Sequence, residues 1–332
     1  MTRLKARLAA FAVMAATALM PLSAQAEQLE STFDQVLGTM PRAPRAATSL
    51  EMQLAALAEA SQGRIGVAAL DLDSGHSVSV LGNQPFPMAS TSKIAIVATF
   101  LAGVDRNRFS LSDRYPLMMP VPSKKFSTTV APVRAGAMLS AEQLIELALT
   151  RSDNNATDAL LAVVGGPAAV TKWVHSNTGI TEFRLDRDIA TLVRDDGAVN
   201  PAVTIDRRDS ITPNAMIRLL SGLYRGDWLS RSSHDVLIGA MSRCRTGRNR
   251  IKALLPEGTA IAHKTGTLSN TASDVGFIET SDGRNLAVAI YVTGQGGRQN
   301  RDSRIALLAK AIYDGYAGSE SGNMLPRRTA LR

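Results

Sequence analysis

The stretch STSKIAIVATFL (Ser90–Leu101) sets a serine and a lysine three residues apart at the start of a run of apolar side chains. The apolar run predicts a buried helix that begins near Ser90, so that Lys93 lies about one turn away on the same face. A serine hydroxyl becomes a strong nucleophile when a neighbouring base takes its proton, and a desolvated lysine with a lowered pKa can be that base. Taken alone, the spacing equally fits a helix cap followed by a solvated lysine.

Two further short segments carry chemistry that fits this pair. The SDN segment (Ser152–Asn154) lies between two predicted helices, where a serine hydroxyl can relay a proton and an asparagine amide can bind a substrate carbonyl. The HKTGT segment (His263–Thr267) ends a predicted strand, and its glycine permits close approach of a ligand or of another backbone. Each segment alone is common, and SDN is also typical of a plain turn.

The three segments occur in the order S-x-x-K, S-D-N and K-T-G, each in a suitable helix, loop or strand context. With Leu185–Arg187 (LDR) and Asp209–Pro213 (DSITP), they give a sequence that resembles the penicillin-recognising serine enzymes, most closely the class A β-lactamases, over about Ser49 to Tyr313. The resemblance implies an α+β fold of the β-lactamase/transpeptidase type. Helices would flank an antiparallel sheet formed from both chain ends, with an inserted all-α subdomain.

The resemblance also implies roles for individual residues. Ser90 would be the acylated nucleophile and Lys93 its proton acceptor, with Ser152 completing the proton path. Backbone N–H groups of Ser90 and Thr267 would form the oxyanion hole. The segment TGRNR (Thr246–Arg250) is similar to one that supplies a carboxylate-binding arginine in some class A enzymes, although Arg250 equally fits a surface position. The residues implied to bind substrate are Asn154, Lys264, Thr265, Gly266, Thr267 and Arg250.

The loop after Leu185–Arg187 departs from the family pattern, in which a glutamate in an E-x-x-L-N motif activates the deacylating water. Alignment without a gap puts Ile189 at the glutamate position, and an isoleucine cannot accept a proton. Alignment backwards from Asp209 instead matches Asn200 with the motif asparagine and Asp196 with the glutamate. This second alignment needs about seven extra loop residues, which cost little entropy. Asp196 is therefore the predicted deacylation base, and Asn200 is predicted to join the substrate-binding residues as the amide that positions the water. Asp195 is a neighbouring candidate for the base, although Asp195 and Asp196 also fit a solvated loop.

Hydrophobic patterns predict the elements around these segments. We expect a helix over Ser49–Ala60, a hairpin over 64–81, and strands at 260–264, 275–279 and 286–292 before a helix over 304–313. The middle of the chain predicts helices at 141–151, 157–164, 168–176, 213–225 and 232–242, with 186–209 as a loop. We therefore expect one catalytic domain over 27–316, with its sheet part at about 48–86 and 255–316 and its helical part at about 87–254.

The chain ends and the composition bound the class of protein. Residues 1–26 combine three basic residues, an apolar stretch and a small-residue A-x-A site, which predicts a secretory signal peptide cut after Ala26 and a periplasmic or secreted protein. A membrane anchor is the alternative, but the apolar stretch is shorter than the ~20 residues that a spanning helix needs. Residues 317–332 are predicted to be disordered. The lone Cys244 excludes an internal disulfide.

Three functions remain open. The first is a β-lactam hydrolase, slowed by the absent glutamate; the second is a penicillin-binding D,D-peptidase or transpeptidase acting on peptidoglycan stem peptides. The third is a non-catalytic sensor of β-lactams or wall fragments. We expect a monomer without metal or cofactor that binds no nucleic acid, because the basic residues are dispersed and lack interleaved aromatics.

Overall fold

The computed structural model describes residues 48–60 and 62–317. The predicted signal peptide over 1–26 and the tail from Gly318 onward lie outside the described residues, whereas Ala317 is the last residue of a helix. Within the described ranges, no helix is both long and apolar enough to cross a membrane.

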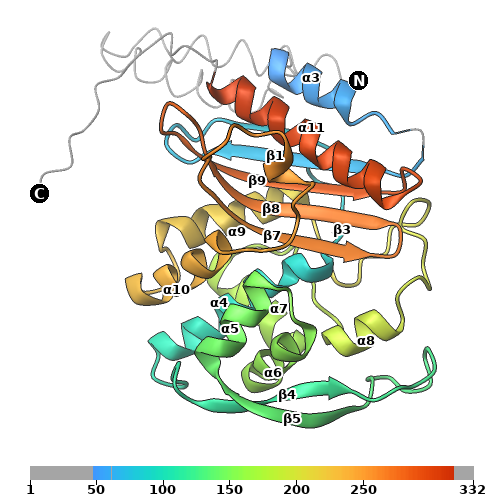
Figure 1. Ribbon diagram of the computed structural model, residues 1–332, viewed down its shortest axis with the longest axis vertical. Coiled ribbons are helices and arrows are strands. Elements are labelled where there is room, and N and C mark those ends of the chain that lie inside the picture. The colour runs from blue at the N-terminus through green and yellow to red at the C-terminus, as the bar shows by residue number, and fades with distance from the viewer. Residues whose placement is uncertain (1–47, 61, 318–332) are drawn as a thin grey trace, which may run out of the picture. The chain divides into compact units, whose positions relative to one another are not determined.

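A five-stranded antiparallel sheet joins the two ends of the described chain (Figure 1). Its strand order is β2-β1-β9-β8-β7. The strands are β1 (Ile65–Asp71), β2 (Ser77–Val80), β7 (Ile261–Leu268), β8 (Thr271–Glu279) and β9 (Asn285–Thr293). The central pairing of β1 with β9, in which Ala68 faces Ala289, confirms the predicted sheet from both chain ends.

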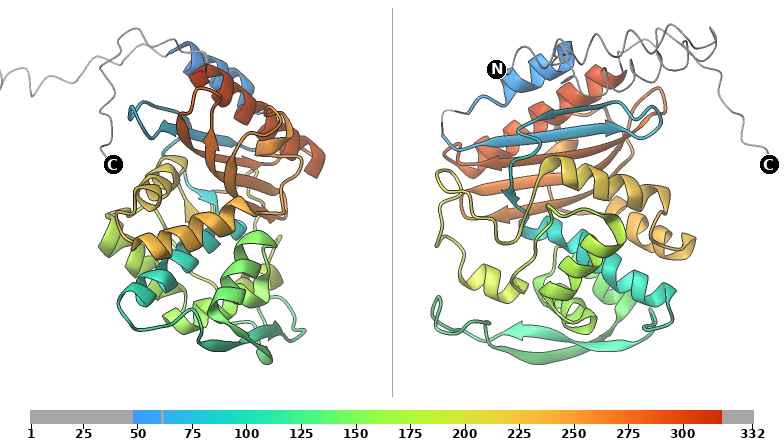
Figure 2. Two further views of the ribbon diagram at one scale, coloured as in Figure 1. Left: turned by 60° about the vertical axis from the view of Figure 1, so that its left-hand side comes forward. Right: turned by 180° about the vertical axis from the view of Figure 1, so that it is seen from behind.

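Both faces of this sheet are buried, as alternate residues of β9 show. Leu286, Val288 and Ile290 pack toward α3 (Ser49–Leu57) and α11 (Arg298–Ala317). Ala287 and Tyr291 pack on the other side, where α9 (Pro213–Arg225) and α10 (Arg231–Ser242) meet the sheet. Figure 2 shows α3 and α11 above the sheet and the remaining helices below it. Burial of both faces explains why β9 is a continuous apolar run.

The helical part is inserted between β2 and β7, and its core helix is the apolar run of the opening segment. That helix is α4 (Lys93–Asp105), preceded by a 3-10 turn over Ala89–Ser92. Around it pack α5 (Ala141–Thr150), α6 (Asn154–Val164) and α7 (Pro167–Thr178), as predicted. Serine or aspartate caps start two of these helices: Ser140 accepts from Gln143 N–H, and Asp153 accepts from Ala156 N–H.

Three local expectations need correction. The inserted part is not all-α, because β4 (Arg114–Pro120) and β5 (Val133–Ser140) form an antiparallel ribbon beneath the helices (Figure 1). The predicted loop over 186–209 contains a short helix, α8 (Ile189–Arg194). Strand β7 continues past Lys264 to Leu268, so the K-T-G segment lies inside the strand, paired with β8. A two-residue β3 (Phe86–Pro87) pairs with β6 (Ser210–Ile211) and ties this loop to the start of the helical part.

Helix α11 tests the packing of the upper layer, because it carries a buried and an exposed residue two positions apart. Ile305 is 0% exposed against the sheet, and Leu307 is 44% exposed. Replacing a buried isoleucine by alanine leaves a cavity and costs about 2–5 kcal/mol. We expect Ile305→Ala to lower the free energy of unfolding within that range, and Leu307→Ala to lower it by less than ~1 kcal/mol. Urea unfolding measures both, and equal losses would contradict the packing described.

Candidate active site

Ser90 is presented by a strained turn at the base of a cavity. Ala89 has a φ of +48°, a conformation that costs free energy for a residue with a side chain. The hydroxyls of Thr91 and Ser92 stabilise this turn by donating 2.8 Å hydrogen bonds to the carbonyls of Met88 and Ala89. Ser90 itself is partly exposed and lines a cavity of about 420 Å³.

Lys93 follows one turn later and is completely buried. Its ammonium group donates to the Ser152 carbonyl and to Asn154 Oδ1, both at 2.8 Å, and to the Asp153 carbonyl at 3.2 Å. Burial, followed by the charge of Lys264, lowers the pKa of Lys93 well below its usual value. The solvated lysine that S-x-x-K alone also allowed is therefore not what this sequence forms.

The hydroxyl of Ser152 lies between two buried lysines. Its Oγ is 2.9 Å from the Nζ of Lys264 and 3.4 Å from the Nζ of Lys93. Lys264 is also 0% exposed, and burial lowers its pKa to about 8. Ser152 adopts a φ of +58°, which turns its carbonyl toward Lys93 as well. The segments S-x-x-K, S-D-N and K-T-G thus converge through one hydroxyl, and a proton can pass along this chain of hydrogen bonds.

Gly266 brings the K-T-G strand against the turn that presents Ser90. A Cβ at this position would lie 2.6 Å from the carbonyl oxygen of Met88 and 2.4 Å from Ser273 Oγ. Only glycine lets β7 approach so closely. The next residue, Thr267, is exposed and lines the cavity that Ser90 lines. The arrangement can therefore present N–H groups of β7 and of the Ser90 turn to one substrate oxygen.

Arg250 is buried, with 2% exposure, so its alternative placement at the surface is wrong. Its Nε contacts Asp302 at 2.7 Å, and its Nη2 donates to Thr267 Oγ1 at 2.8 Å. Nη1 donates to the carbonyls of Gly266 and Ser273. The guanidinium therefore stabilises β7 through these hydrogen bonds, and it also lines the cavity.

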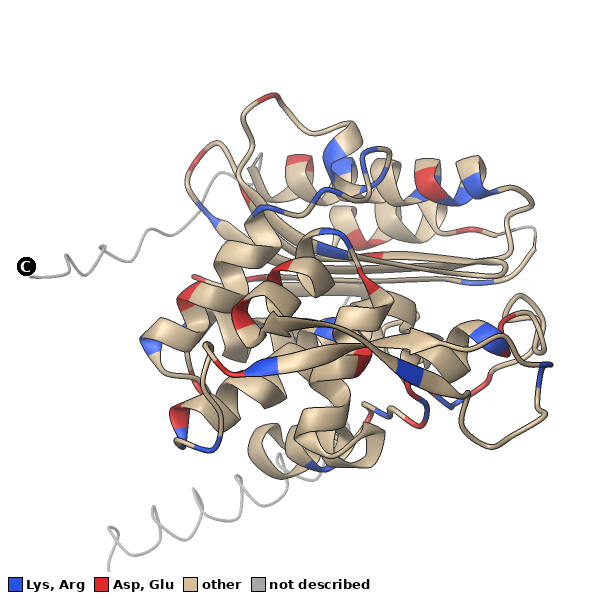
Figure 3. Ribbon diagram, turned by 60° about the horizontal axis from the view of Figure 1, so that its bottom comes forward, with Lys and Arg blue, Asp and Glu red and all other residues tan. Residues whose placement is uncertain are grey.

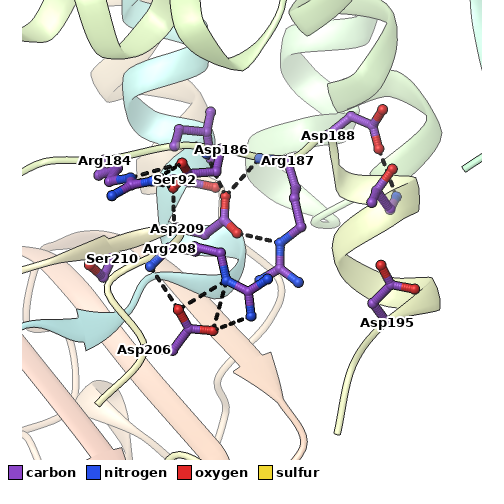
Figure 4. Close-up of polar contacts among 12 residues, drawn as sticks. Ser92, Arg184, Asp186, Arg187, Asp188, Asp195, Asp206, Arg208, Asp209 and Ser210 are labelled. Carbon is purple, nitrogen blue, oxygen red and sulfur yellow. Dashed lines mark hydrogen bonds and ion pairs between the residues drawn. The ribbon is translucent and has the colours of Figure 1, made fainter. Parts of the chain in front are cut away.

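A compact ion-pair cluster joins the two ends of the 186–209 loop, whose sequence departs from the family pattern (Figure 4). Arg187 Nε lies 2.6 Å from Asp209 Oδ2, and Asp209 Oδ1 accepts from the N–H groups of Asp186 and Arg187. Asp209 is buried, which strengthens these charge-assisted bonds. The L-D-R and D-S-I-T-P segments therefore meet in space, although 21 residues separate Arg187 from Asp209 in the sequence.

Sequence reasoning missed Asp158, which holds the start of α8. Its two carboxylate oxygens accept from Ile189 N–H at 2.7 Å and Ala190 N–H at 2.8 Å. Burial raises the pKa of Asp158 to about 7 against the opposing effect of these two N–H groups. A signal was available, because Asp158 lies four residues after Asn154 among buried positions of α6.

The three loop residues that the sequence nominated for deacylation, Asp195, Asp196 and Asn200, do not line the Ser90 cavity. The carboxylate of Asp196 accepts from Ser269 N–H at 2.8 and 3.0 Å, and Asn200 Oδ1 accepts from Asn270 Nδ2 at 2.8 Å. Both contacts reach the turn after β7, and Asp196 lines a neighbouring cavity rather than the one that Ser90 lines. Asp195 is buried and forms an ion pair with Arg194 at 2.8 Å. The structure therefore brings Ser90, Asn154, Thr265, Thr267 and Arg250 to one cavity, with Lys93 and Lys264 beneath it.

A second missed cluster lies behind β7. His263 Nδ1 is 2.8 Å from Asp274 Oδ1, and both side chains are fully buried. Burial opposes a charge on this imidazole, but Asp274 prevails and raises the pKa of His263 to about 9. The neighbouring imidazolium in turn lowers the pKa of the buried Cys244 thiol to about 7, although burial alone would raise it. This ion pair fixes the strand residue that precedes Lys264.

Comparisons with known proteins agree with this geometry. The β-lactamase enzyme family matches residues 49–316, so the chain belongs to that family. A β-lactamase of Proteus vulgaris is 32% identical over 271 residues, covering 79% of this chain and 93% of the relative. The β-lactamase CTX-M-97 of Escherichia coli is 31% identical, covering 81% and 90%. Among solved structures, an ancestral class A β-lactamase is 33% identical with a TM-score of 0.68, covering 80% of this chain and all of that one.

The pKa of Asp158 makes folding depend on pH in a defined direction. Its folded pKa of about 7 lies above the usual unfolded value of ~3.9, so the folded state binds the extra proton. This contribution is present below pH ~4 and is lost as the pH rises through 7. We expect Asp158→Asn to gain on the order of 3 kcal/mol in unfolding free energy relative to wild type between pH 4 and pH 8.

Urea unfolding at several pH values measures this gain. Asp314→Asn, a change at an exposed carboxylate on α11, is the matched control and should show a much smaller change over the same interval. A difference between Asp158→Asn and wild type that stays flat from pH 4 to pH 8 would show that Asp158 is not a perturbed carboxyl.

Proposed function

We propose that the protein hydrolyses the cyclic amide of β-lactams through an acyl-enzyme on Ser90. The observation that carries the proposal is the Ser152 hydroxyl held between the two buried lysines, 2.9 Å from Lys264 and 3.4 Å from Lys93, at the base of the Ser90 cavity. The β-lactamases to which the chain is similar support the substrate class.

In the proposed acylation, Lys93 takes the proton of the Ser90 hydroxyl as its oxygen attacks the lactam carbonyl. Burial supports this step, because it lowers the pKa of Lys93 and favours a neutral amine able to accept a proton. The N–H groups of Ser90 and Thr267 face the developing oxyanion. Ser152 then passes a proton to the lactam nitrogen as the C–N bond breaks, and Lys93 or Lys264 resupplies it.

The proposed binding mode uses the two sides of the cavity differently. The substrate carboxylate lies near Lys264, Thr265, Thr267 and Arg250, where the positive charge is buried and oriented. The acylamino group lies near Asn154, whose Oδ1 is already an acceptor for Lys93 and whose amide nitrogen is left to bind a carbonyl. Because Gly266 has no side chain, β7 lies close to the Ser90 turn, so that a substrate placed along β7 can reach both.

Deacylation is the demanding step, and we propose Asp196 as its general base with Asn200 beside it. The carboxylate is bound to Ser269 N–H on a neighbouring cavity, so it must reach its water from the side of the β7–β8 turn. A misplacement of ~1 Å can cost ~100-fold in rate, so we expect slow turnover. Asp195 is less suited, because Arg194 already holds its carboxylate.

One observation favours the second candidate function, a penicillin-binding D,D-peptidase. Ile189, the residue that an ungapped alignment puts at the glutamate position, is 2% exposed and packs into the core. An isoleucine side chain cannot act as a general base, so an acyl-enzyme that depends on this position for deacylation would persist. Peptidoglycan stem peptides are the substrates in that case. Export and cleavage after Ala26 stay a prediction from residues 1–26.

Ser90→Ala tests the nucleophile. We expect it to abolish covalent labelling by a fluorescent penicillin, because no other hydroxyl in the cavity has both a lysine one turn away and a strained turn behind it. Ser242→Ala, which removes an exposed hydroxyl at the end of α10, is the matched control and should retain labelling. Labelling that survives in the Ser90 variant would overturn the assignment.

Asp196→Asn tests the proposed base. The amide oxygen can still accept from Ser269 N–H, so the loop keeps its contact while the carboxylate is lost. We expect deacylation to slow at least tenfold with acylation nearly unchanged. Rapid-quench mass spectrometry separates the steps, with Asp206→Asn, another acid of the same loop, as the control. Equal slowing of both steps would exclude Asp196 as the base.

A further inference from the structure

The cavity that Ser90 lines is strongly positive. Four arginines line it, and Asp302 is the one carboxylate among its lining residues. The arginines are Arg245, Arg248, Arg250 and Arg298. A hollow walled by one sign of charge focuses the electric field on whatever enters it.

Asp302 balances only part of this charge. Its Oδ1 lies 2.7 Å from Arg250 Nε, and its Oδ2 lies 3.9 Å from Arg298 Nε. The remaining nitrogens of Arg250 contact carbonyls and a hydroxyl of β7 and β8, so this guanidinium is largely committed. Asp302 therefore leaves the other two arginines uncompensated.

Arg245 and Arg248 differ from most arginines of the protein. Both are exposed, and among residues 48–60 and 62–317 neither side chain has an ion pair or a hydrogen bond. Elsewhere charges of both signs lie close together on the ribbon (Figure 3), and the neighbouring Arg243 contacts Glu146 at 2.7 Å. Two unneutralised guanidinium groups beside a nucleophile are available to an anionic ligand.

The segment that carries these two arginines is fixed in place. Arg245 N–H donates to the Thr150 carbonyl at 2.8 Å, and Thr246 Oγ1 lies 2.6 Å from Thr265 Oγ1. Gly247 closes the turn by accepting from Arg250 N–H at 2.9 Å. The arginines therefore flank the part of β7 that carries Thr265 and Thr267, where the substrate carboxylate is proposed to lie.

We propose that Arg245 and Arg248 form a second anion subsite, which gives the enzyme a preference for β-lactams with an additional acidic group next to the ring carboxylate. The C3 substituent of a cephalosporin occupies that place. The inference rests on the proposed function, because it uses the proposed orientation of the substrate. An acid on the acylamino side, near Asn154, should gain nothing from this subsite.

Cefonicid and cefamandole provide a matched test, since they share one acylamino side chain and differ in a sulfomethyl or a methyl group on the tetrazole of the C3 substituent. We expect wild type to acylate cefonicid faster, and the double variant Arg245→Gln/Arg248→Gln to lower the cefonicid/cefamandole ratio of acylation rate constants by about tenfold at low salt. Added 0.5 M NaCl should reduce the wild-type ratio in the same direction.

Two controls fix the location of the effect. The double variant Arg134→Gln/Arg231→Gln removes the same charge from exposed positions outside the cavity and should leave the ratio unchanged. Carbenicillin and benzylpenicillin differ by a carboxylate on the acylamino side, and the ratio of their rates should not respond to Arg245→Gln/Arg248→Gln. An unchanged cefonicid/cefamandole ratio in the cavity variant, or an equal fall in the control variant, would overturn the proposal.

Equilibrium binding to the Ser90→Ala protein separates this inference from the proposed function. Wild type that acylates both cephalosporins without preference would leave the hydrolase standing and exclude the subsite. Wild type that is not acylated, while Ser90→Ala still binds cefonicid more tightly through the two arginines, would support the subsite and overturn the proposed chemistry. Failure of both proteins to bind either cephalosporin would contradict both proposals.

Discussion

Two lysine amino groups, buried side by side, are the constraint on which the site depends. Lys93 and Lys264 are both 0% exposed, and a buried polar group is tolerated only where it has hydrogen-bond partners. Most of the acceptors come from the SDN turn at the start of α6, which supplies the Ser152 hydroxyl and carbonyl and Asn154 Oδ1, and Lys264 also donates to the Thr265 carbonyl. The helical part and the sheet must therefore pack so that α4, α6 and β7 meet at this turn.

The same burial lowers the pKa values that the proposed mechanism uses. Desolvation lowers the pKa of both amines, so that either can exchange a proton with the Ser152 hydroxyl between them. Two residues of the site have a strained backbone, Ala89 at φ +48° and Ser152 at φ +58°. The Ala89 turn is held by the Ser92 hydroxyl and by the close approach of Gly266, and the Ser152 carbonyl accepts from Lys93. The lowered pKa values of the two lysines and the packing of the fold around them therefore have a common cause, which is burial.

Local chemistry is what the sequence predicts well. The order S-x-x-K, S-D-N and K-T-G carried the resemblance that implied the fold, and the hydrophobic patterns predicted the strands at both chain ends. Strands β4 and β5 were missed since Arg114–Pro120 contains two prolines and a half-exposed surface, without clean alternation. Asp158 was missed because its role in holding α8 depends on Ile189, which lies 31 residues away and donates its N–H to the Asp158 carboxylate. The position of Asp196 could not be settled either, since the neck between Arg187 and Asp209 fixes the ends of the loop and leaves its interior free to pack on the β7–β8 turn.

The most direct test of the Ser90 acyl-enzyme mixes the purified protein with the chromogenic cephalosporin nitrocefin and records the protein mass and the amount of product over the same time course. We expect a transient adduct on the peptide that contains Ser90, and product that exceeds the enzyme many-fold at a slow steady rate. A single stoichiometric burst that ends in a stable adduct would contradict hydrolysis and indicate a penicillin-binding protein. Product without any adduct would contradict the Ser90 acyl-enzyme itself.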